Sequence, residues 1–440
     1  MVDAARRAFA AGELRVGSLV FPWRPVAQGL AVGVVLTTIG FAEGGLVPRT
    51  WRLASIAVLV LAATALLSRE RIVLRRLDWF VLAALAALVV WTALSAAWSS
   101  QPTASLLQAE RVLVYLAGVL AFLLVAERAA LPHVLVGALA GITVIAAYGL
   151  TRYVVAPPPL DQFEGKLLYQ PFGYANALGI FTAIGIVLAV GLAFWAQGAT
   201  ARAAALAPIL VLAPALYYTS SRGAWLALVG GLAVVVGFGS RARPAVLAPL
   251  LTILAAAVVA GVVAASPHDR TLSRFAGENR PHYWHVALDD YQAHPVLGSG
   301  AGTYGSYWLR HRPDRSFTRT AHSLYLQSLA ELGPVGLVLV IAALGLPLVA
   351  LRGRPHPLAG AAAGGYVAYL LHTGIDWDWE MPAATLAGLA CGAALLLAAR
   401  DERGPGISPR TRTALLAVVL VLTAVGFVRL ATGPATPFGT

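Results

Sequence analysis

The chain has 440 residues, of which 59% are apolar and only 12% are charged, and its formal net charge is +12. A soluble domain carries about twice that share of charged residues, so this chain is too apolar to cover a water-facing surface. The composition therefore excludes a soluble globular protein, a disordered chain and a coiled coil. Cys391 is the only cysteine, which also excludes a disulfide framework. The sequence predicts a polytopic membrane protein.

Apolar runs bounded by arginine, proline and glycine predict an all-α fold with about 12–13 transmembrane helices, because about 20 apolar residues cross a bilayer as a helix. The candidate spans, in chain order, are 26–42, 53–67, 79–97, 105–126, 134–155, 171–196, 203–219, 222–239, 245–264, 323–351, 358–375, 381–399 and 413–430. The second and the seventh are short. Glycine pairs at Gly230–Gly231 and Gly364–Gly365 predict close helix packing.

The spans divide the chain into five parts. Residues 1–25 carry several arginines and no small-residue cleavage site, which predicts a cytoplasmic segment rather than a removable signal peptide. Residues 26–264 hold the first nine predicted spans, and residues 265–321 form one long, partly helical loop. Residues 322–430 hold the last four predicted spans, and residues 431–440 form a tail.

Arginines set the predicted orientation, because positive charge marks the cytoplasmic loops of membrane proteins. Basic clusters follow the second span at 69–76, the eighth at 241–243 and the twelfth at 400–412. Placing these clusters in the cytoplasm with the amino terminus leaves the long loop extracytoplasmic. The same rule accounts for the net positive charge, so nucleic-acid binding is not expected.

The remaining polar residues converge on the predicted outer face. The long loop contains arginines, histidines and aromatic residues: Arg270, Arg274, Arg280, Arg310, Arg312, Arg315, Arg319, His268, His282, His285, His294, His311, Tyr283, Trp284, Tyr291, Tyr304, Tyr307 and Trp308. Span ends on the same face add Gln170, Tyr174, Asn176, Ser220, Ser221, Arg222, His322, Asp376, Asp378 and Glu380. Guanidinium groups bind diphosphate bidentately, and a histidine can take a proton from a hydroxyl nucleophile. This pattern indicates either an enzyme that acts on a lipid-linked diphospho-sugar or a glycolipid transporter.

Several of these features also have a purely structural interpretation. Arg222 at a span end can extend to the membrane interface, and His322 at a helix start can be a structural histidine. The turn Asp376–Glu380 can be a solvated hairpin with an aromatic belt. The loop histidines show no HxH, HExxH or HxxxH spacing and have no cysteine partner, so no metal site is expected.

Three motifs together resemble the O-antigen ligase and polymerase superfamily of bacterial membrane glycosyltransferases, of the GT-C type. Residues 219–226 are similar to the family's Ser-Arg-Gly segment, and residues 294–300 to its HPxxGxG turn, which follows Arg280 and Trp284 here. His322 and Ser323, with Gly333 to Gly336, fit the ligase signature H-[NSQ]-x9-G-x-x-G. A weaker fourth similarity is Phe172 to Asn176.

The resemblance implies a metal-independent, inverting glycosyl transfer without a cofactor, in the bacterial inner (cytoplasmic) membrane with the active site facing the periplasm or the exterior. The implied donor is a glycan on undecaprenyl diphosphate, and the acceptor is a hydroxyl of lipid A core, a growing polysaccharide or another surface glycan. His322 would be the general base, and Arg222 would stabilise the leaving diphosphate. The implied substrate-binding residues are Arg280, Arg319, Arg152, Asn176, Tyr174, Ser221 and Asp376.

Four functions therefore remain under comparison. An O-antigen ligase is favoured over a polymerase because the His322 signature is complete, although a thirteenth span exceeds the usual twelve of the ligases. A protein O-oligosaccharyltransferase is a third possibility. A glycolipid transporter would distribute charged residues through the bilayer depth, whereas here they gather at one face, with Glu110 and Arg111 as the main exception.

Overall fold

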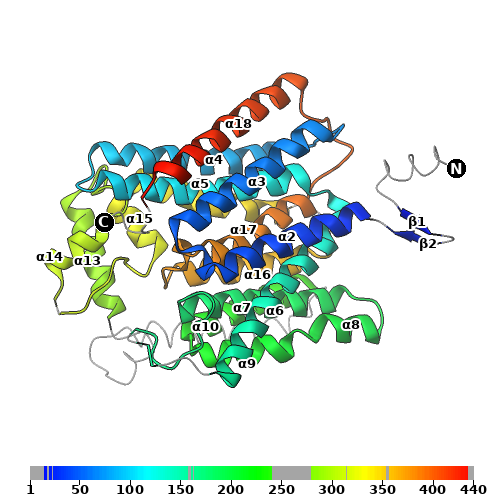
Figure 1. Cartoon of the computed structure of the whole chain (residues 1–440), viewed down its shortest axis with the longest axis horizontal. Coiled ribbons are helices and arrows are strands. Elements are labelled where there is room, and N and C mark those ends of the chain that lie inside the picture. The colour runs from blue at the N-terminus through cyan, green and yellow to red at the C-terminus, as the bar shows by residue number, and fades with distance from the viewer. Residues whose placement is uncertain are drawn as a thin grey trace.

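The structure is a computed structural model and describes residues 14–16, 19–21, 23–156, 160–161, 163–239, 279–313, 315–352 and 356–434. Most of its long helices run side by side in one bundle (Figure 1). The helices are α2 (Trp23–Phe41), α3 (Pro48–Ser68), α4 (Arg76–Leu94), α5 (Pro102–Val125), α6 (Leu131–Val155), α7 (Ala175–Trp195), α8 (Ala199–Leu206), α9 (Ile209–Thr219), α10 (Arg222–Gly239), α13 (Arg280–Ala293), α14 (Tyr304–His311), α15 (Leu324–Val349), α16 (Ala359–Thr373), α17 (Pro382–Ala398) and α18 (Pro409–Thr432). Short 3-10 turns include η2 (Ser95–Ala97) and η5 (Asp378–Glu380).

The predicted fold class is confirmed. Among the described residues, nine helical segments are long and apolar enough to cross a membrane, and α10 and α17 are shorter apolar helices. In lipid a helix satisfies its backbone polar groups internally, which is why each apolar run folds as one. The predicted span 245–264 lies outside the described residues.

Two local details differ from the predicted elements. The apolar segment expected at 203–219 begins earlier and is divided into α8 and α9, with Pro208 at the division. Before the first long helix, β1 (Leu14–Val16) and β2 (Leu19–Phe21) pair as a short antiparallel hairpin that hydropathy alone does not indicate.

Glycines allow the closest helix contacts, as predicted for the two glycine pairs. A Cβ on Gly231 would lie 2.7 Å from the carbonyl oxygen of Gly364, and one on Gly364 would lie 2.6 Å from the carbonyl oxygen of Gly231. Similarly, a Cβ on Gly137 of α6 would collide with the backbone of Gly29 in α2. Small residues at these positions let α10 pack on α16 and α2 pack on α6.

A break in α15 holds the long loop against the bundle. Gly333 has left-handed φ (67°) and Pro334 has no backbone N–H, so carbonyl groups before them lose their helical partners. The loop supplies replacements: the Ser299 N–H donates to the carbonyl of Ala330 at 3.0 Å, and the Gly300 N–H to that of Glu331 at 2.8 Å. The turn at 294–300 and the signature around Gly333 are therefore one structural unit.

The same unit extends to two other elements. The Trp91 indole of α4 donates to the carbonyl of Leu332 at 2.9 Å. The buried Glu331 side chain accepts the backbone N–H of Tyr304 at 2.9 Å, at the start of α14. These contacts fix α13 and α14 over one end of the bundle, where Figure 1 places them, opposite the β1–β2 hairpin.

Candidate active site

A fully buried carboxylate, Asp376, gathers three side chains from two other segments, the start of α7 and the start of α13, at the end of the bundle that α13 and α14 cover. It lies between α16 and η5. Tyr174 donates its hydroxyl to Oδ1 at 2.6 Å, and Asn176 donates its amide to Oδ2 at 2.8 Å. Arg280 donates Nη2 to Oδ2 at 2.5 Å. Four predicted site residues thus form one cluster.

The cluster is electrostatically stable although it is buried. Burial alone would raise the pKa of Asp376, but the Arg280 guanidinium and nearby histidines outweigh burial and hold that pKa below its usual range. The pKa of Tyr174 is raised, first by burial and then by the neighbouring Asp376 charge. Asp376 is therefore an anion that fixes Arg280, while Tyr174 stays a protonated donor.

His322 lies close enough to this cluster for the charges of Asp376 and Arg280 to affect its pKa. Burial lowers the pKa of His322, while Asp376 partly opposes that shift. The ring packs on Tyr283, with centroids 5.0 Å apart, and Nδ1 lies 3.2 Å from the carbonyl oxygen of Thr320. The tautomer that donates Nδ1–H to this carbonyl leaves the Nε2 lone pair available. Such an imidazole is neutral at pH 7 and suits a general base.

The Ser-Arg-Gly segment forms the amino end of α10 beside this cluster. Ser221 is buried, and its Oγ accepts the Ala224 backbone N–H at 3.3 Å. Arg222 is exposed at the first position of the helix. A Cβ on Gly223 would lie 3.1 Å from His372 Nε2, which joins this helix end to the end of α16. The fold therefore gives Ser221 a capping role in addition to its predicted one and leaves Arg222 at the surface.

The two remaining predicted arginines occupy different places. Arg152 is exposed in the last turn of α6. Arg319 lies over the Phe317 ring, 5.4 Å from its centroid, and lines a polar cavity. Neither position assigns a role, so substrate binding by Arg152 and Arg319 stays a prediction.

The polar cavity lies between α5, α14, α15 and η5 and encloses about 830 Å³ when its open mouth is included. Its polar lining consists of Gln101, Gln108, Ser306, Arg319, Gln327 and Glu380. Gln327 also accepts the backbone N–H of Ala321 at 2.9 Å, which places the cavity directly beside His322. Amide, hydroxyl and charged groups of this kind can hydrogen-bond the hydroxyls of a sugar.

Sequence reasoning missed His372 and Glu164 near the site. His372 and Asp378 are fully buried and lie 3.0 Å apart through Nδ1 and Oδ1. Glu164 accepts the backbone N–H of Ala175 at 3.2 Å, and burial raises the pKa of Glu164 to about 7. A polar residue near the end of an apolar run, as His372 is, was the available signal. Among the described residues, no group of three or more His, Cys, Asp or Glu could hold a metal ion.

The fold and this site define a class of protein. It is a multi-pass helical membrane protein with an arginine–carboxylate cluster and a neutral histidine at one end. The family model described as O-Antigen ligase matches residues 207–341, which include Arg222, Arg280, Arg319 and His322. Residues 207–341 are thus similar to the O-antigen ligase family, and the predicted resemblance to this superfamily is confirmed. Members of this family are membrane glycosyltransferase-like enzymes with glycan-lipid substrates. No curated protein matches the chain.

Proposed function

We propose that the protein is an O-antigen ligase-like glycosyltransferase, which moves a glycan from undecaprenyl diphosphate to a hydroxyl of a surface acceptor. The observation that carries this proposal is the cluster of Arg280, Asp376, Tyr174 and Asn176 beside a histidine whose pKa is lowered. Arg280 offers a guanidinium group in a fixed position, and the histidine offers a base. The polar cavity lined by Arg319 and Gln327 has room for sugar residues.

In the proposed reaction, His322 Nε2 takes the proton from the acceptor hydroxyl as its oxygen attacks the anomeric carbon. The bond between that carbon and the diphosphate oxygen breaks, and its electron pair leaves with the diphosphate. Attack from the face opposite the leaving group inverts the anomeric centre. No metal takes part, because guanidinium groups supply the positive charge that the departing diphosphate requires.

Arg280 suits the clamp because one of its nitrogens is already held by Asp376. The guanidinium group has five N–H donors in a rigid fork, so the contact through Nη2 leaves others to bind the diphosphate. Arg222 would add a second guanidinium at the amino end of α10, where the helix dipole favours an anion. Asp376 is then a positioning residue for Arg280, and Tyr174 and Asn176 fix Asp376 in turn.

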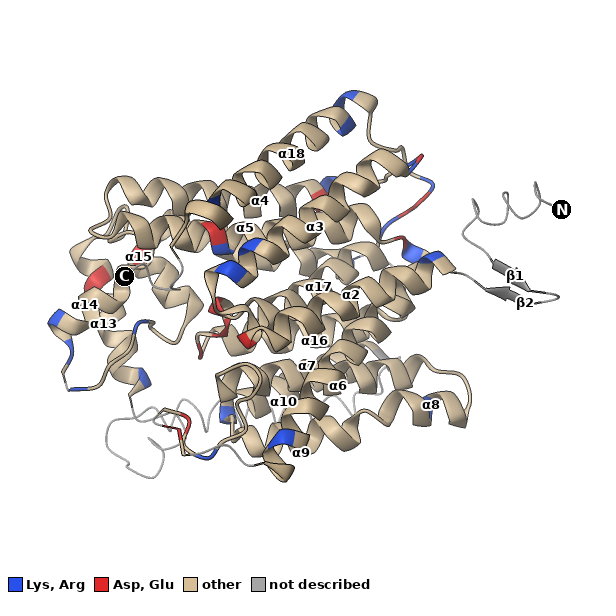
Figure 2. Ribbon diagram, in the orientation of Figure 1, with Lys and Arg blue, Asp and Glu red and all other residues tan. Residues whose placement is uncertain are grey.

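The alternative functions differ in the acceptor that they use and in the distribution of charged residues that they require. A polymerase of the same superfamily, or a protein O-oligosaccharyltransferase, would use the same donor chemistry with another acceptor. The complete His322 signature favours the ligase. A glycolipid transporter needs charged residues along the bilayer depth. Figure 2 displays the charged residues mainly near helix ends, so transport is the less favoured function.

Purified protein incubated with undecaprenyl-diphosphate glycan and separate acceptors tests the proposal. We expect undecaprenyl diphosphate to appear with one acceptor class, and the product mass then identifies ligase, polymerase or protein transfer. His322→Ala protein serves as the control for non-enzymatic hydrolysis. Movement of intact donor across the membrane of proteoliposomes, without release of the diphosphate, would instead establish the transporter.

A further inference from the structure

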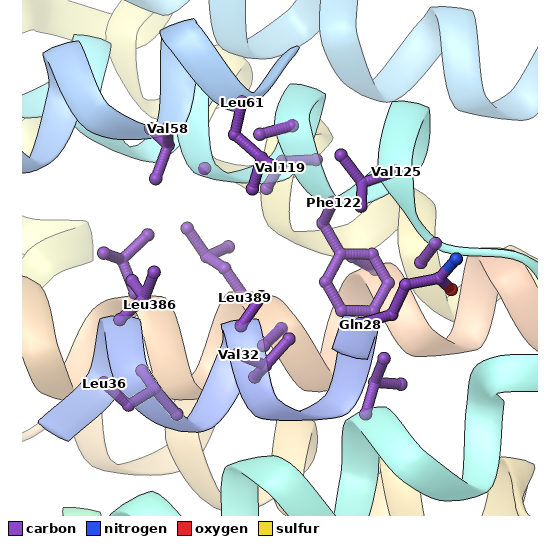
Figure 3. A pocket seen from close by; sticks show the side chains of 18 residues that line it. Gln28, Val32, Leu36, Val58, Leu61, Val119, Phe122, Val125, Leu386 and Leu389 are labelled. Carbon is purple, nitrogen blue, oxygen red and sulfur yellow. The ribbon is translucent and has the colours of Figure 1, made fainter. Parts of the chain in front are cut away.

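An apolar groove opens between α2 and α3, away from the candidate active site. Figure 3 shows Val58 and Leu61 of α3 on one side, Val32 and Leu36 of α2 on the other, and the Phe122 ring of α5 between them. Residues of α17 complete the lining, and Gln28 is its one polar side chain. The groove measures about 690 Å³ with its open mouth. Within a membrane, such a surface is in contact with hydrocarbon chains.

The groove exists because α2 and α3 pack on different partners. Gly29 and Gly33 bring α2 against α6, whereas α3 packs along α5. The two helices therefore diverge, and their facing sides are left without a helix between them.

At its end near Gln28 the groove continues into a polar pocket. Gln28, Leu61 and Val125 line both spaces. The polar pocket is lined by three arginines, Arg24, Arg69 and Arg71, together with two hydroxyl side chains and two glutamates, Glu70 and Glu127. The combined space is apolar along one part and arginine-rich at its end. It is therefore complementary to a lipid that has an apolar chain and an anionic headgroup.

The charges of this pocket leave an excess of arginine. Arg69 pairs with Glu127 at 2.5 Å and donates to the carbonyl groups of Leu124 and Val125 at 2.8 and 2.7 Å. The remaining charged lining residues are Arg24, Arg71 and Glu70, and Arg71 also donates through Nη2 to the carbonyl groups of Arg403, at 3.1 Å, and Gly404. The Arg24 guanidinium lies over the Trp23 ring, 5.7 Å from its centroid. Tryptophan and arginine in this combination are typical of the membrane interface.

We propose that this groove and pocket bind an anionic glycerophospholipid, with an acyl chain between α2 and α3 and the phosphate beside Arg24 and Arg71. The site differs from that of the proposed donor and does not depend on the proposed function. Helix α5 has 24 residues and is therefore roughly 36 Å long, and it separates the Arg69 pocket from the cavity at Gln101. A diphosphate held by Arg280 lies at the other membrane surface.

Native mass spectrometry of the full chain in neutral detergent tests the proposal, with phosphatidylglycerol and phosphatidylcholine of equal chain length as probes. We expect the protein to retain phosphatidylglycerol at least about five-fold better than phosphatidylcholine. Arg24→Gln should lower this preference about five-fold, because one arginine at the interface contributes about that much. Arg76→Gln, an exposed arginine outside the pocket at the same end of the bundle, is the matched control and should change nothing.

Filling the groove tests the acyl chain separately. Val32→Trp should lower the occupancy of both lipids, while Val34→Trp, on the exposed side of the same helix, should not. If Val32→Trp protein does not fold, Leu61→Trp fills the groove from α3. Equal retention of the two lipids, or a preference that survives Arg24→Gln, would overturn the headgroup site. A third outcome would also overturn the proposal. If undecaprenyl diphosphate displaced phosphatidylglycerol from both the wild-type and the Val34→Trp protein, the groove would hold the lipid chain of the donor.

Discussion

Two residues of the candidate site adopt a backbone conformation that side chains rarely take. Ser220 has φ of 52° and His322 has φ of 51°, and neither is glycine. Left-handed residues of this kind cost on the order of 1–3 kcal/mol each and persist where the surrounding structure requires them. Ser220 comes two positions before Arg222, and His322 is the proposed base. Ser220 takes this conformation as the left-handed cap that ends α9, whereas His322 takes it at the position of the proposed base.

His322→Ala should insert and fold normally, bind the lipid-linked donor, and transfer glycan at least about 100-fold more slowly, because acid–base assistance contributes roughly 10²–10⁴ in rate. His285→Ala is the matched control, since His285 is an exposed loop histidine paired with Asp289. Initial transfer rates of equal amounts of folded protein provide the measurement. Near-parental transfer by His322→Ala protein would remove His322 from the mechanism.

The pH profile of the wild-type protein gives a second measure of the same base. Protonation removes the base, so the rate should fall as the pH drops through the pKa of His322. Because burial lowers that pKa, the fall should lie below the ordinary histidine value of about 6.5. In His322→Ala protein this acid limb should be absent.

Arg222→Lys should lose most of the transfer activity although the positive charge remains, because an ammonium group cannot reproduce the bidentate fork. Losing one contact to a developing charge lowers the rate about 10²–10³-fold. Arg310→Lys is the control, since Arg310 lies in α14 over the Tyr307 ring. A parental rate for Arg222→Lys would make Arg222 an interfacial arginine without a catalytic role.

At the scale of elements, the break in α15 connects the long loop with the candidate base. Gly298 and Gly333 face each other, and both have left-handed φ, of 73° and 67°. A Cβ on Gly333 would also lie 2.6 Å from the carbonyl oxygen of Val296. Gly298 and Gly333 are 35 positions apart in the chain. The two motifs that contain them thus form one backbone contact.

Gly333→Ala should lower the free energy of unfolding by about 1–3 kcal/mol, because the residue must keep a left-handed backbone and meets the Val296 carbonyl. Transfer should fall as well, because the loop that ends at His322 loses its support. Gly345→Ala in the same helix is the control, since a Cβ there meets no atom within 4 Å. Thermal melting in detergent provides the comparison. Equal melting of the two variants would show that the break does not stabilise the loop.

At the scale of the whole molecule, the charge rule predicts that the candidate active site faces the outside. Arg315→Cys, at an exposed position of the long loop, should react with an impermeant thiol reagent in intact cells. Ser68→Cys, at the exposed end of α3 on the opposite face of the bundle, should react only after lysis. The native Cys391 is buried, so its background is low. Reactivity in the reverse order would overturn the predicted orientation.

The sequence alone indicates the membrane class, most of the described helices and the motifs that lie in one stretch of chain. These are local properties, because the length of an apolar run decides whether a helix spans a bilayer, and proline and glycine mark its ends. The Ser-Arg-Gly segment and the His322 signature could be read for the same reason. The order of polar residues along the chain also indicated that Asp376, Arg280 and Asn176 share one face.

Which of these residues are in contact depends on how the helices pack. Tyr174 and Asp376 are 202 positions apart, and their hydrogen bond depends on how α7 and α16 pack, which hydropathy does not encode. Packing also turned the Ser221 hydroxyl inward as a helix cap and paired His372 with Asp378 inside the bundle. The groove between α2 and α3 has the same origin, because the glycines of α2 select α6 as its neighbour. A hydropathy pattern defines each helix alone, whereas close contacts between small residues define the neighbours, and the site lies where those neighbours meet.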